Sequence, residues 1–263
     1  MACGNSGNSS NATPAATKKL VLTGSSTIAP LASELAKRYE SQHADVRIDV
    51  QSGGSSRGIV DARQGSADIG MVSRSLKPDE KDLQSFTIAQ DGVAIILNKT
   101  NGIADLSNEQ IVGIYTKKIT NWKEVGGKDA PITVVNKAEG RSTLELFASY
   151  FKLETKEIKA DSVIGENEQA IKLVAGNPDA IAYVSIGTAE YEANQSAAIK
   201  LLPMRGIEAS TANILNGQFP LSRPLNLVTK TTPMGLSKEF IDFAQSKAND
   251  DIVKAQYFVP FVR

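Results

Sequence analysis

Short apolar segments with strand character alternate with segments of helical spacing along this chain, and this alternation constrains the fold more than any other feature. In the first third of the sequence, the predicted strands cover residues 19–23, 46–50, 67–72 and 93–97. The segment 28–41 has apolar residues at the spacing of one helix face, namely Leu31, Leu35, Ala36 and Tyr39. The alternation predicts an α/β fold with a mostly parallel sheet and helices on its faces.

The same alternation continues beyond residue 98. Predicted helices cover residues 107–115, 144–151, 166–176 and 238–248, and predicted strands cover residues 132–135, 180–184 and 225–229. We find no repeat of fixed period. A chain of 263 residues has room for one large domain or two small ones, and needs neither a disulfide nor a metal to hold its core.

The ionisable residues argue against several classes of function. Lysine plus arginine and aspartate plus glutamate both number 29, so the chain lacks the basic surface of a nucleic-acid-binding protein. One histidine and one cysteine are too few for a zinc site, and His43 lies in a polar segment typical of a solvated helix end. No apolar run reaches the roughly 18 residues that span a bilayer. We therefore predict no nucleic-acid partner, no metal and no cofactor.

The first residues suggest a cellular compartment. Residues 1–17 are rich in Asn, Ser, Gly, Thr, Pro and Ala and cannot bury apolar area, so we expect a disordered linker. Cys3 resembles the lipidated cysteine at the mature end of a bacterial lipoprotein, with the signal peptide already removed. The alternative is an incidental cysteine in a terminal tag. The first interpretation predicts a lipid-anchored protein of the periplasm or the outer face of the cell membrane.

Three strand-to-helix junctions carry small hydroxyl residues where the helix begins. They are Gly-Ser-Ser-Thr at 24–27, Ser-Gly-Gly-Ser-Ser at 52–56 and Gly-Arg-Ser-Thr at 140–143. The first turn of a helix has unpaired N–H groups and the positive end of the helix dipole, and glycine lets an anion approach the backbone closely. Each junction is therefore a candidate oxyanion site. Helix capping by serine or threonine is the alternative for any one of them.

Arginines accompany these junctions. Arg57 and Arg141 belong to two of them, and Ser73-Arg74 ends another strand. A guanidinium matches phosphate oxygens with two parallel hydrogen bonds, so Arg74 and Arg141 favour an anion site, whereas Arg57 fits a solvated helix equally well. The chain has neither a nucleotide-binding P-loop nor a Gly-x-Ser-x-Gly nucleophile elbow, which argues against nucleotide binding and serine hydrolysis.

An ordered set of motifs resembles the phosphate-binding proteins of ABC transporters. The motifs are TGSSTIAP at 23–30, SGGSSRGI at 52–59, DIGMVSR at 68–74, DGVA at 91–94, ITNW at 119–122 and FPLSRPL at 219–225. The resemblance covers nearly the whole chain from Leu20 to the end. Each motif is weak alone, but the set in this order is specific to the family.

The resemblance implies a two-lobed periplasmic-binding-protein type II fold, in which each lobe is a mixed, mostly parallel sheet flanked by helices. Lobe one would comprise residues 18–98 and 201–263, and lobe two residues 99–200, with the crossover segments acting as a hinge. The family holds a desolvated phosphate between its lobes. Carried over to this chain, the expected phosphate-binding residues are Ser26, Thr27, Ser55, Ser56, Ser73, Arg74, Asp91, Arg141, Ser142 and Thr143.

The chain departs from the family pattern at two points. Many relatives have a Gly-Ser-Gly-Thr-type loop where this chain has Gly-Arg-Ser-Thr at 140–143, and some carry an aspartate at the position of Ser73. The nearest candidate acid here is Asp91. A carboxylate can accept a proton from phosphate but repels sulfate, which has no proton to give, so Asp91 is expected to select phosphate.

The expected function is capture of inorganic phosphate outside the cytoplasm by a monomer that is not an enzyme, followed by delivery to the membrane subunits of an ABC permease. Three alternatives remain: a binding protein for sulfate or molybdate, a surface protein that senses phosphate, and a phosphoryl-transfer enzyme. The enzyme would need a metal cluster or a nucleophile with a base, and the sequence shows neither. The sensing protein would share the fold, because a fold does not fix a function.

Overall fold

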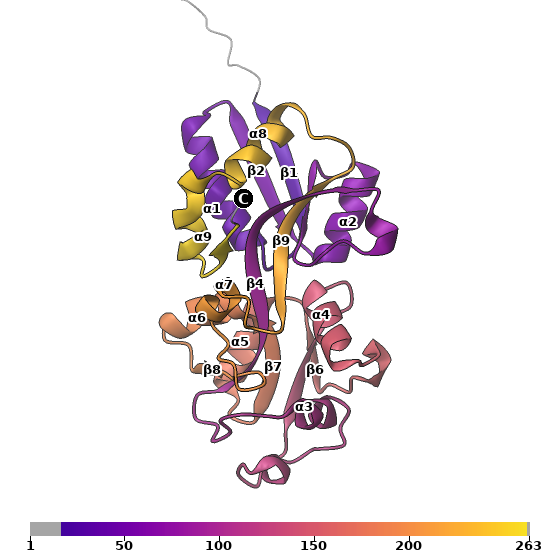
Figure 1. The fold of residues 1–263 in the computed structure, drawn as a ribbon, viewed down its shortest axis with the longest axis vertical. Helices are drawn as coiled ribbons and strands as arrows, with labels where there is room; N and C mark the ends of the chain where they lie inside the picture. The colour runs from indigo at the N-terminus through magenta and orange to yellow at the C-terminus, as the bar shows by residue number, and fades with distance from the viewer. Residues whose placement is uncertain (1–16, 262–263) are drawn as a thin grey trace, which may run out of the picture.

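The computed structural model describes residues 17–261 and shows two lobes joined by the long strands β4 (Gln84–Asn98) and β9 (Ser222–Thr229) (Figure 1). The predicted lipidation site Cys3 and the predicted linker, apart from Thr17, lie outside the described residues. Within residues 17–261, no helix is long and apolar enough to cross a bilayer.

The first lobe, drawn at the top of Figure 1, combines the early and late parts of the described chain. Its elements are β1 (Lys18–Gly24), α1 (Ala29–Gln42), β2 (Val46–Ser52), α2 (Ser55–Gln64), β3 (Ile69–Val72), α8 (Gly235–Ala244), α9 (Asp250–Ala255) and β10 (Val259–Pro260). Strand β1 pairs in parallel with β2 and β3. Strand β9 then lies between β3 and β4 and is antiparallel to both.

The second lobe is built mainly from the chain between β4 and β9. Its elements are α3 (Asn108–Tyr115), β5 (Thr133–Lys137), α4 (Ser142–Phe151), β6 (Ser162–Ile164), α5 (Asn167–Gly176), β7 (Ala180–Ser185), α6 (Ile186–Asn194), β8 (Ile199–Leu201) and α7 (Thr211–Leu215). Strand β5 is parallel to β6 and β7, whereas β7 and β8 are antiparallel to β4. The predicted two-lobed α/β fold with mixed sheets is confirmed.

The crossing strands extend further than the sequence patterns indicate. The strand predicted at 93–97 is the fully buried end of β4, while the start of β4 mixes exposed and partly buried positions and so shows no apolar run. Val93, Leu202 and Leu221 all pack in the core of the second lobe. The paired residues Gly92 and Ser222 lie at the start of this packing. We therefore propose that the chain crosses between the lobes near residues 92 and 222 rather than at 98 and 201.

Each lobe has its own apolar core. In the first lobe, α1 buries the predicted face that includes Leu31, Leu35 and Tyr39. In the second lobe, aromatic side chains pack among the aliphatic ones, and the rings of Phe147 and Tyr183 stack with centroids 4.0 Å apart. Because the two cores are separate, the lobes can move relative to each other without either core being opened.

A glycine ends β1 where the chain turns toward α1. Gly24 has a φ of 131°, and a Cβ added there would lie 2.3 Å from the carbonyl oxygen of Met71, so a larger residue does not fit. The N–H of Ser25 then bonds to that same carbonyl at 2.8 Å. This turn fixes the position of the hydroxyl residues that follow β1.

Candidate functional site

The three predicted junctions meet at one small cavity between the lobes. The first lobe contributes residues that follow β1, β2 and β3, and the second lobe contributes residues at or after the ends of β5 and β6. The lining residues are Ser25, Ser26, Thr27, Gly54, Ser55, Ser73, Lys137, Arg141, Ser142, Thr143 and Gly165. The carboxyl ends of strands form the edge at which open α/β sheets bind ligands.

Serine hydroxyls form a chain across the cavity. Ser25 Oγ donates to Ser73 Oγ at 2.8 Å, and Ser73 Oγ lies 2.6 Å from Ser142 Oγ of the other lobe. Ser55 Oγ accepts a hydrogen bond from the N–H of Ser73 at 3.1 Å. A hydroxyl proton can rotate, so these groups can donate to an anion placed among them.

Capping by the N-cap side chain explains none of the three junctions within the described chain. In the turn before α1, Ser25 Oγ accepts from the N–H groups of Thr27 and Ile28 at 3.2 and 3.3 Å, but Ile28, the N-cap residue of α1, makes no side-chain capping bond. The N-cap residues Gly54 of α2 and Arg141 of α4 make no side-chain capping bond within the described chain. The positive ends of α2 and α4 therefore face the cavity uncapped by their N-cap side chains, which favours an anion there.

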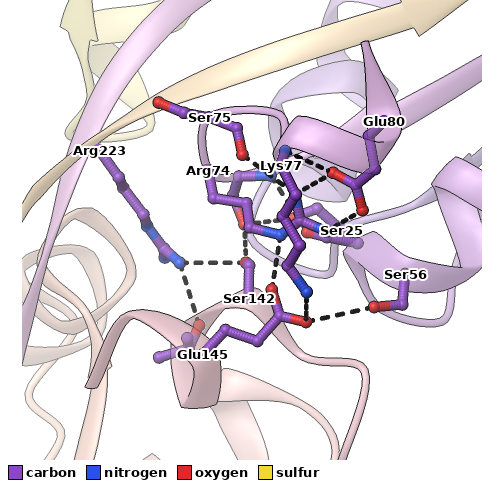
Figure 2. A network of polar contacts seen from close by, with 12 residues as sticks. Ser25, Ser56, Arg74, Ser75, Lys77, Glu80, Ser142, Glu145 and Arg223 are labelled. Carbon is purple, nitrogen blue, oxygen red and sulfur yellow. Dashed lines mark hydrogen bonds and ion pairs between the residues drawn. The ribbon is translucent and has the colours of Figure 1, made fainter. Parts of the chain in front are cut away.

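Arg223 ties hydroxyls of both lobes together. Its side chain is 1% exposed and donates to Thr27 Oγ1 and Thr143 Oγ1, each at 3.1 Å. It also donates to Ser142 Oγ at 3.4 Å (Figure 2). The hydroxyls accept these bonds through their lone pairs. Their own protons therefore remain available to point at a ligand.

Asp91 lies behind Arg223 rather than in the cavity wall. Its Oδ2 accepts from Arg223 Nη2 at 2.8 Å and from Nε at 3.1 Å, and its Oδ1 accepts from the N–H of Gly187 at 3.2 Å. Both carboxylate oxygens therefore already accept hydrogen bonds from the protein. The arrangement orients the Arg223 guanidinium toward the hydroxyls and places Asp91 one layer away from its predicted contact with phosphate.

Lys137 is a site residue that the sequence analysis did not identify. It ends β5, is 3% exposed and lines the cavity, and its Nζ has no hydrogen-bond partner among residues 17–261. Burial lowers the pKa of this amine to about 7, Glu166 acts to raise the pKa, and Arg141 and Arg223 lower it further. A cation at the carboxyl end of an apolar strand was the available signal in the sequence.

Arg141 reaches the rim of the same cavity. Its Nη1 lies 2.8 Å from Glu166 Oε1, and its side chain is 16% exposed. Glycines leave room for it in both lobes, because a Cβ added at Gly54 would lie 2.9 Å from Arg141 Cδ, and one added at Gly165 would lie 2.9 Å from Nη2. The arginine is thus enclosed between the lobes.

Arg74 forms a second set of contacts between the lobes, outside the cavity wall. It bonds to Glu80 at 2.6 and 2.8 Å, and its Nε lies 2.6 Å from Glu145 Oε2 on α4 (Figure 2). Lys77 Nζ binds Glu145 Oε1 at 3.0 Å. Burial alone raises the pKa of Glu80, but hydrogen bonds from Arg74 and from the N–H of Lys77 hold it below its usual value. We call Arg74, Lys77, Glu80 and Glu145 the interlobe latch.

The cavity wall brings together seven of the predicted site residues: Ser26, Thr27, Ser55, Ser73, Arg141, Ser142 and Thr143. Ser56, Arg74 and Asp91 lie outside the wall, and Ser56 Oγ instead contacts Glu145 at 3.4 Å. Arg57 lies on the surface of α2 and pairs with Asp61 at 3.1 Å. Contact of each residue with phosphate remains a prediction.

Comparison with known sequences places the whole chain among binding proteins. Residues 9–248 match the family described as the PBP superfamily domain. The phosphate-binding protein PstS of Bacillus subtilis is 31% identical over 272 residues, which cover 98% of this chain and 88% of that protein.

Solved structures agree. A Clostridium perfringens protein assigned as a phosphate ABC transporter substrate-binding protein, and solved with bound phosphate, matches with a TM-score of 0.86 at 35% identity, covering 93% of this chain and 100% of that one. An ABC-type phosphate transport receptor from Vibrio cholerae matches with a TM-score of 0.72 at 31% identity, covering 92% and 99%. These matches confirm the predicted two-lobed periplasmic-binding-protein fold.

Proposed function

The chain belongs to the PBP superfamily and, within it, to the phosphate-binding proteins, and from this premise we propose that it captures inorganic phosphate outside the cytoplasm for an ABC transporter. The cavity between the lobes carries the proposal. Its wall combines serine and threonine hydroxyls, the positive ends of α2 and α4, and the cations Lys137 and Arg141. Such a set of fixed donors replaces the water around a small oxyanion.

We propose that the cavity-lining residues predicted from the sequence bind the phosphate oxygens, and that Lys137 joins them. Arg223 and Asp91 act one layer behind, because Arg223 holds Thr27 and Thr143 in place through their oxygens. In this arrangement Asp91 contributes to binding by orienting Arg223.

The remaining parts of the proposal concern partners and chemistry. The chain acts as a monomer, is held at the outer face of the membrane through Cys3, and delivers phosphate to the membrane subunits of a permease. It is a binding protein and not an enzyme. In support, similar proteins are named for phosphate binding and for phosphate transport.

A second candidate is a binding protein for sulfate or another oxyanion without a proton. One observation favours it: no carboxylate lines the cavity within residues 17–261. A carboxylate in the wall would repel a fully ionised anion, and here that repulsion is missing.

Calorimetry against phosphate, arsenate, sulfate and molybdate separates the two candidates. We expect phosphate and arsenate to bind tightly at neutral pH, because they share a shape and a titratable proton, and sulfate and molybdate to bind at least about 100-fold more weakly, a difference of about 2.7 kcal/mol. Sulfate binding as tight as phosphate binding would replace the proposal with the second candidate.

A further inference from the structure

Both acceptor positions of the Thr27 hydroxyl are filled by N–H groups in the described conformation. Its Oγ1 accepts one hydrogen bond from Arg223 Nη2 at 3.1 Å and a second from Asn167 Nδ2 at 3.2 Å. A hydroxyl has two lone pairs and one proton, and neither a guanidinium nor an amide nitrogen can accept in return. Thr27 lies in the cavity wall, so its hydroxyl can only donate to a group placed there.

The neighbouring serine hydroxyls of the cavity use their protons differently. Ser25 Oγ also accepts from two N–H groups, but its proton is donated to Ser73 Oγ at 2.8 Å. Ser73 and Ser142 share a hydrogen bond of 2.6 Å in which either oxygen is able to donate. No acceptor in the described chain takes the proton of Thr27, so this proton is left for a ligand.

The two donors to Thr27 come from different parts of the molecule. Arg223 lies opposite Asp91 in the ladder between β4 and β9, close to where the chain crosses between the lobes. Asn167 is the first residue of α5 in the second lobe, is 5% exposed, and also donates to Thr188 Oγ1 of its own lobe at 3.4 Å. Because Thr27 belongs to the first lobe, opening the lobes separates it from Asn167 and frees one of its acceptor positions.

We propose, on the basis of the function proposed above, that Asn167 is a positioning residue for phosphate. When the lobes close, its amide fills the second acceptor position of Thr27 and so commits the Thr27 proton to a phosphate oxygen. Asn167 lies outside the cavity wall and acts through Thr27. The open protein that first meets phosphate lacks this bond, so the contribution of Asn167 arises only in the closed complex. A hydroxyl with a single available arrangement costs less entropy to order around the anion.

A double-mutant cycle on the phosphate affinity of the full chain tests this coupling. Asn167→Ala should weaken phosphate binding about 5- to 10-fold, as expected for the loss of one hydrogen bond. In the Thr27→Val background the same change should alter the affinity less than about twofold, because the hydroxyl through which Asn167 acts is gone. Equilibrium dialysis with radiolabelled phosphate measures all four proteins, including weak binders. Asn194→Ala, at an exposed asparagine of α6 in the same lobe, is the matched control and should bind like the parent.

Asn167→Asp distinguishes this role from that of a simple contact between the lobes. Aspartate has nearly the same shape but offers only acceptors, so it takes the Thr27 proton away from the anion. As a simple contact, it would bind the Thr27 hydroxyl at least as well as asparagine does. We expect phosphate affinity to fall at least about 100-fold. The same change in the Thr27→Val background measures the repulsion between the new charge and the anion alone, and its effect should be at least about fivefold smaller.

The outcomes separate the inference from the function on which it rests. If Asn167→Ala binds phosphate like the parent, or loses the same factor with and without Thr27→Val, the coupling is refuted while phosphate capture stands. An equal loss for Asn167→Asp in both backgrounds refutes it as well. If the parent does not bind phosphate, the proposed function itself is refuted. Thermal melting without phosphate shows whether each variant is folded, and the nearly isosteric Asn167→Asp gives the decision if Asn167→Ala does not fold.

Discussion

Arg141 combines two roles at the scale of single residues, because it lies at the rim of the cavity and is enclosed by both lobes. A cation at the start of a helix opposes the helix dipole by about 0.3–1 kcal/mol, so α4 alone does not favour an arginine there. Glu166 offsets part of this unfavourable interaction through its ion pair with Arg141. A bound anion would offset the remainder.

We therefore expect Arg141→Ala to weaken phosphate binding by about 2–5 kcal/mol, since a desolvated anion loses a paired cation. This corresponds to roughly 30-fold to several-thousand-fold in affinity, measured by calorimetry. Arg141→Lys should recover only part of the loss, because an ammonium group cannot supply two parallel hydrogen bonds.

The control for Arg141 is Glu166→Gln, which removes its partner and leaves the guanidinium in place. Phosphate affinity should rise slightly in that variant, because a carboxylate that repels the anion is gone. If Arg141→Ala binds phosphate within about twofold of the parent, a difference near 0.4 kcal/mol, Arg141 does not bind the anion.

The sequence predicted the hydroxyl groups of the site because glycine, serine and threonine at helix starts are local patterns. It missed Arg223 and Lys137, whose roles depend on segments that are distant along the chain. Arg223 binds Asp91 across 132 residues, and the burial of Lys137 results from the approach of two lobes. Arg74 is the opposite case, because the sequence predicted it as a phosphate-binding residue but it lies outside the cavity wall. Its guanidinium is bound by carboxylates that include Glu145.

At the scale of elements, α4 presents both ligand and latch groups to the first lobe. Its first turn holds Ser142 and Thr143 in the cavity wall, and Glu145 on the same helix binds Arg74 and Lys77. Closing the lobes therefore completes the cavity and the interlobe latch in one movement, so the latch contributes to the free energy of closure.

We expect Glu145→Gln to weaken phosphate binding by about 1–3 kcal/mol, or roughly 5- to 150-fold, because the closed form loses its ion pairs with Arg74 and Lys77. The dissociation rate, followed by stopped-flow fluorescence, should rise. Lys77→Met is the matched comparison, and because Lys77 is 46% exposed its loss should cost less than about 1 kcal/mol. Equal dissociation rates in the parent and in Glu145→Gln would show that the latch does not hold the closed form.

The helices and strands that flank the site were largely predictable, but the extent of the crossing strands was not. A strand buried on both faces reads as a continuous apolar run, as at 93–97. The start of β4 pairs with β9 in the first lobe and has a mixed pattern of exposure, which the sequence does not distinguish from a loop. Register between strands this far apart is set by tertiary packing.

At the scale of the whole molecule, contacts between the lobes cover the cavity. The N–H of Ser56 bonds to the carbonyl of Gly140 at 3.1 Å, and Asn167 donates to Thr27 Oγ1 at 3.2 Å. A ligand can enter only when these contacts separate. The described conformation is therefore the closed one, and binding requires an open form.

Small-angle X-ray scattering of the protein should accordingly show a smaller radius of gyration with saturating phosphate than without it, because the anion stabilises the closed form. Glu145→Gln should widen the difference by favouring the open form when phosphate is absent. Identical profiles with and without phosphate, in both the parent and this variant, would contradict closure by a hinge.

The position of β9 has a consequence for how the protein is made. β9 lies between β3 and β4 in the first lobe, yet it is synthesised after the entire second lobe. While the chain is still emerging, the second lobe is a continuous stretch that can fold at once, but β3 and β4 leave unpaired edges until residue 229 has appeared. A chain whose synthesis ends before β9 would thus have a second lobe able to fold and a first lobe in which β3 and β4 expose unpaired edges. Such a chain would be a substrate for chaperones and proteases.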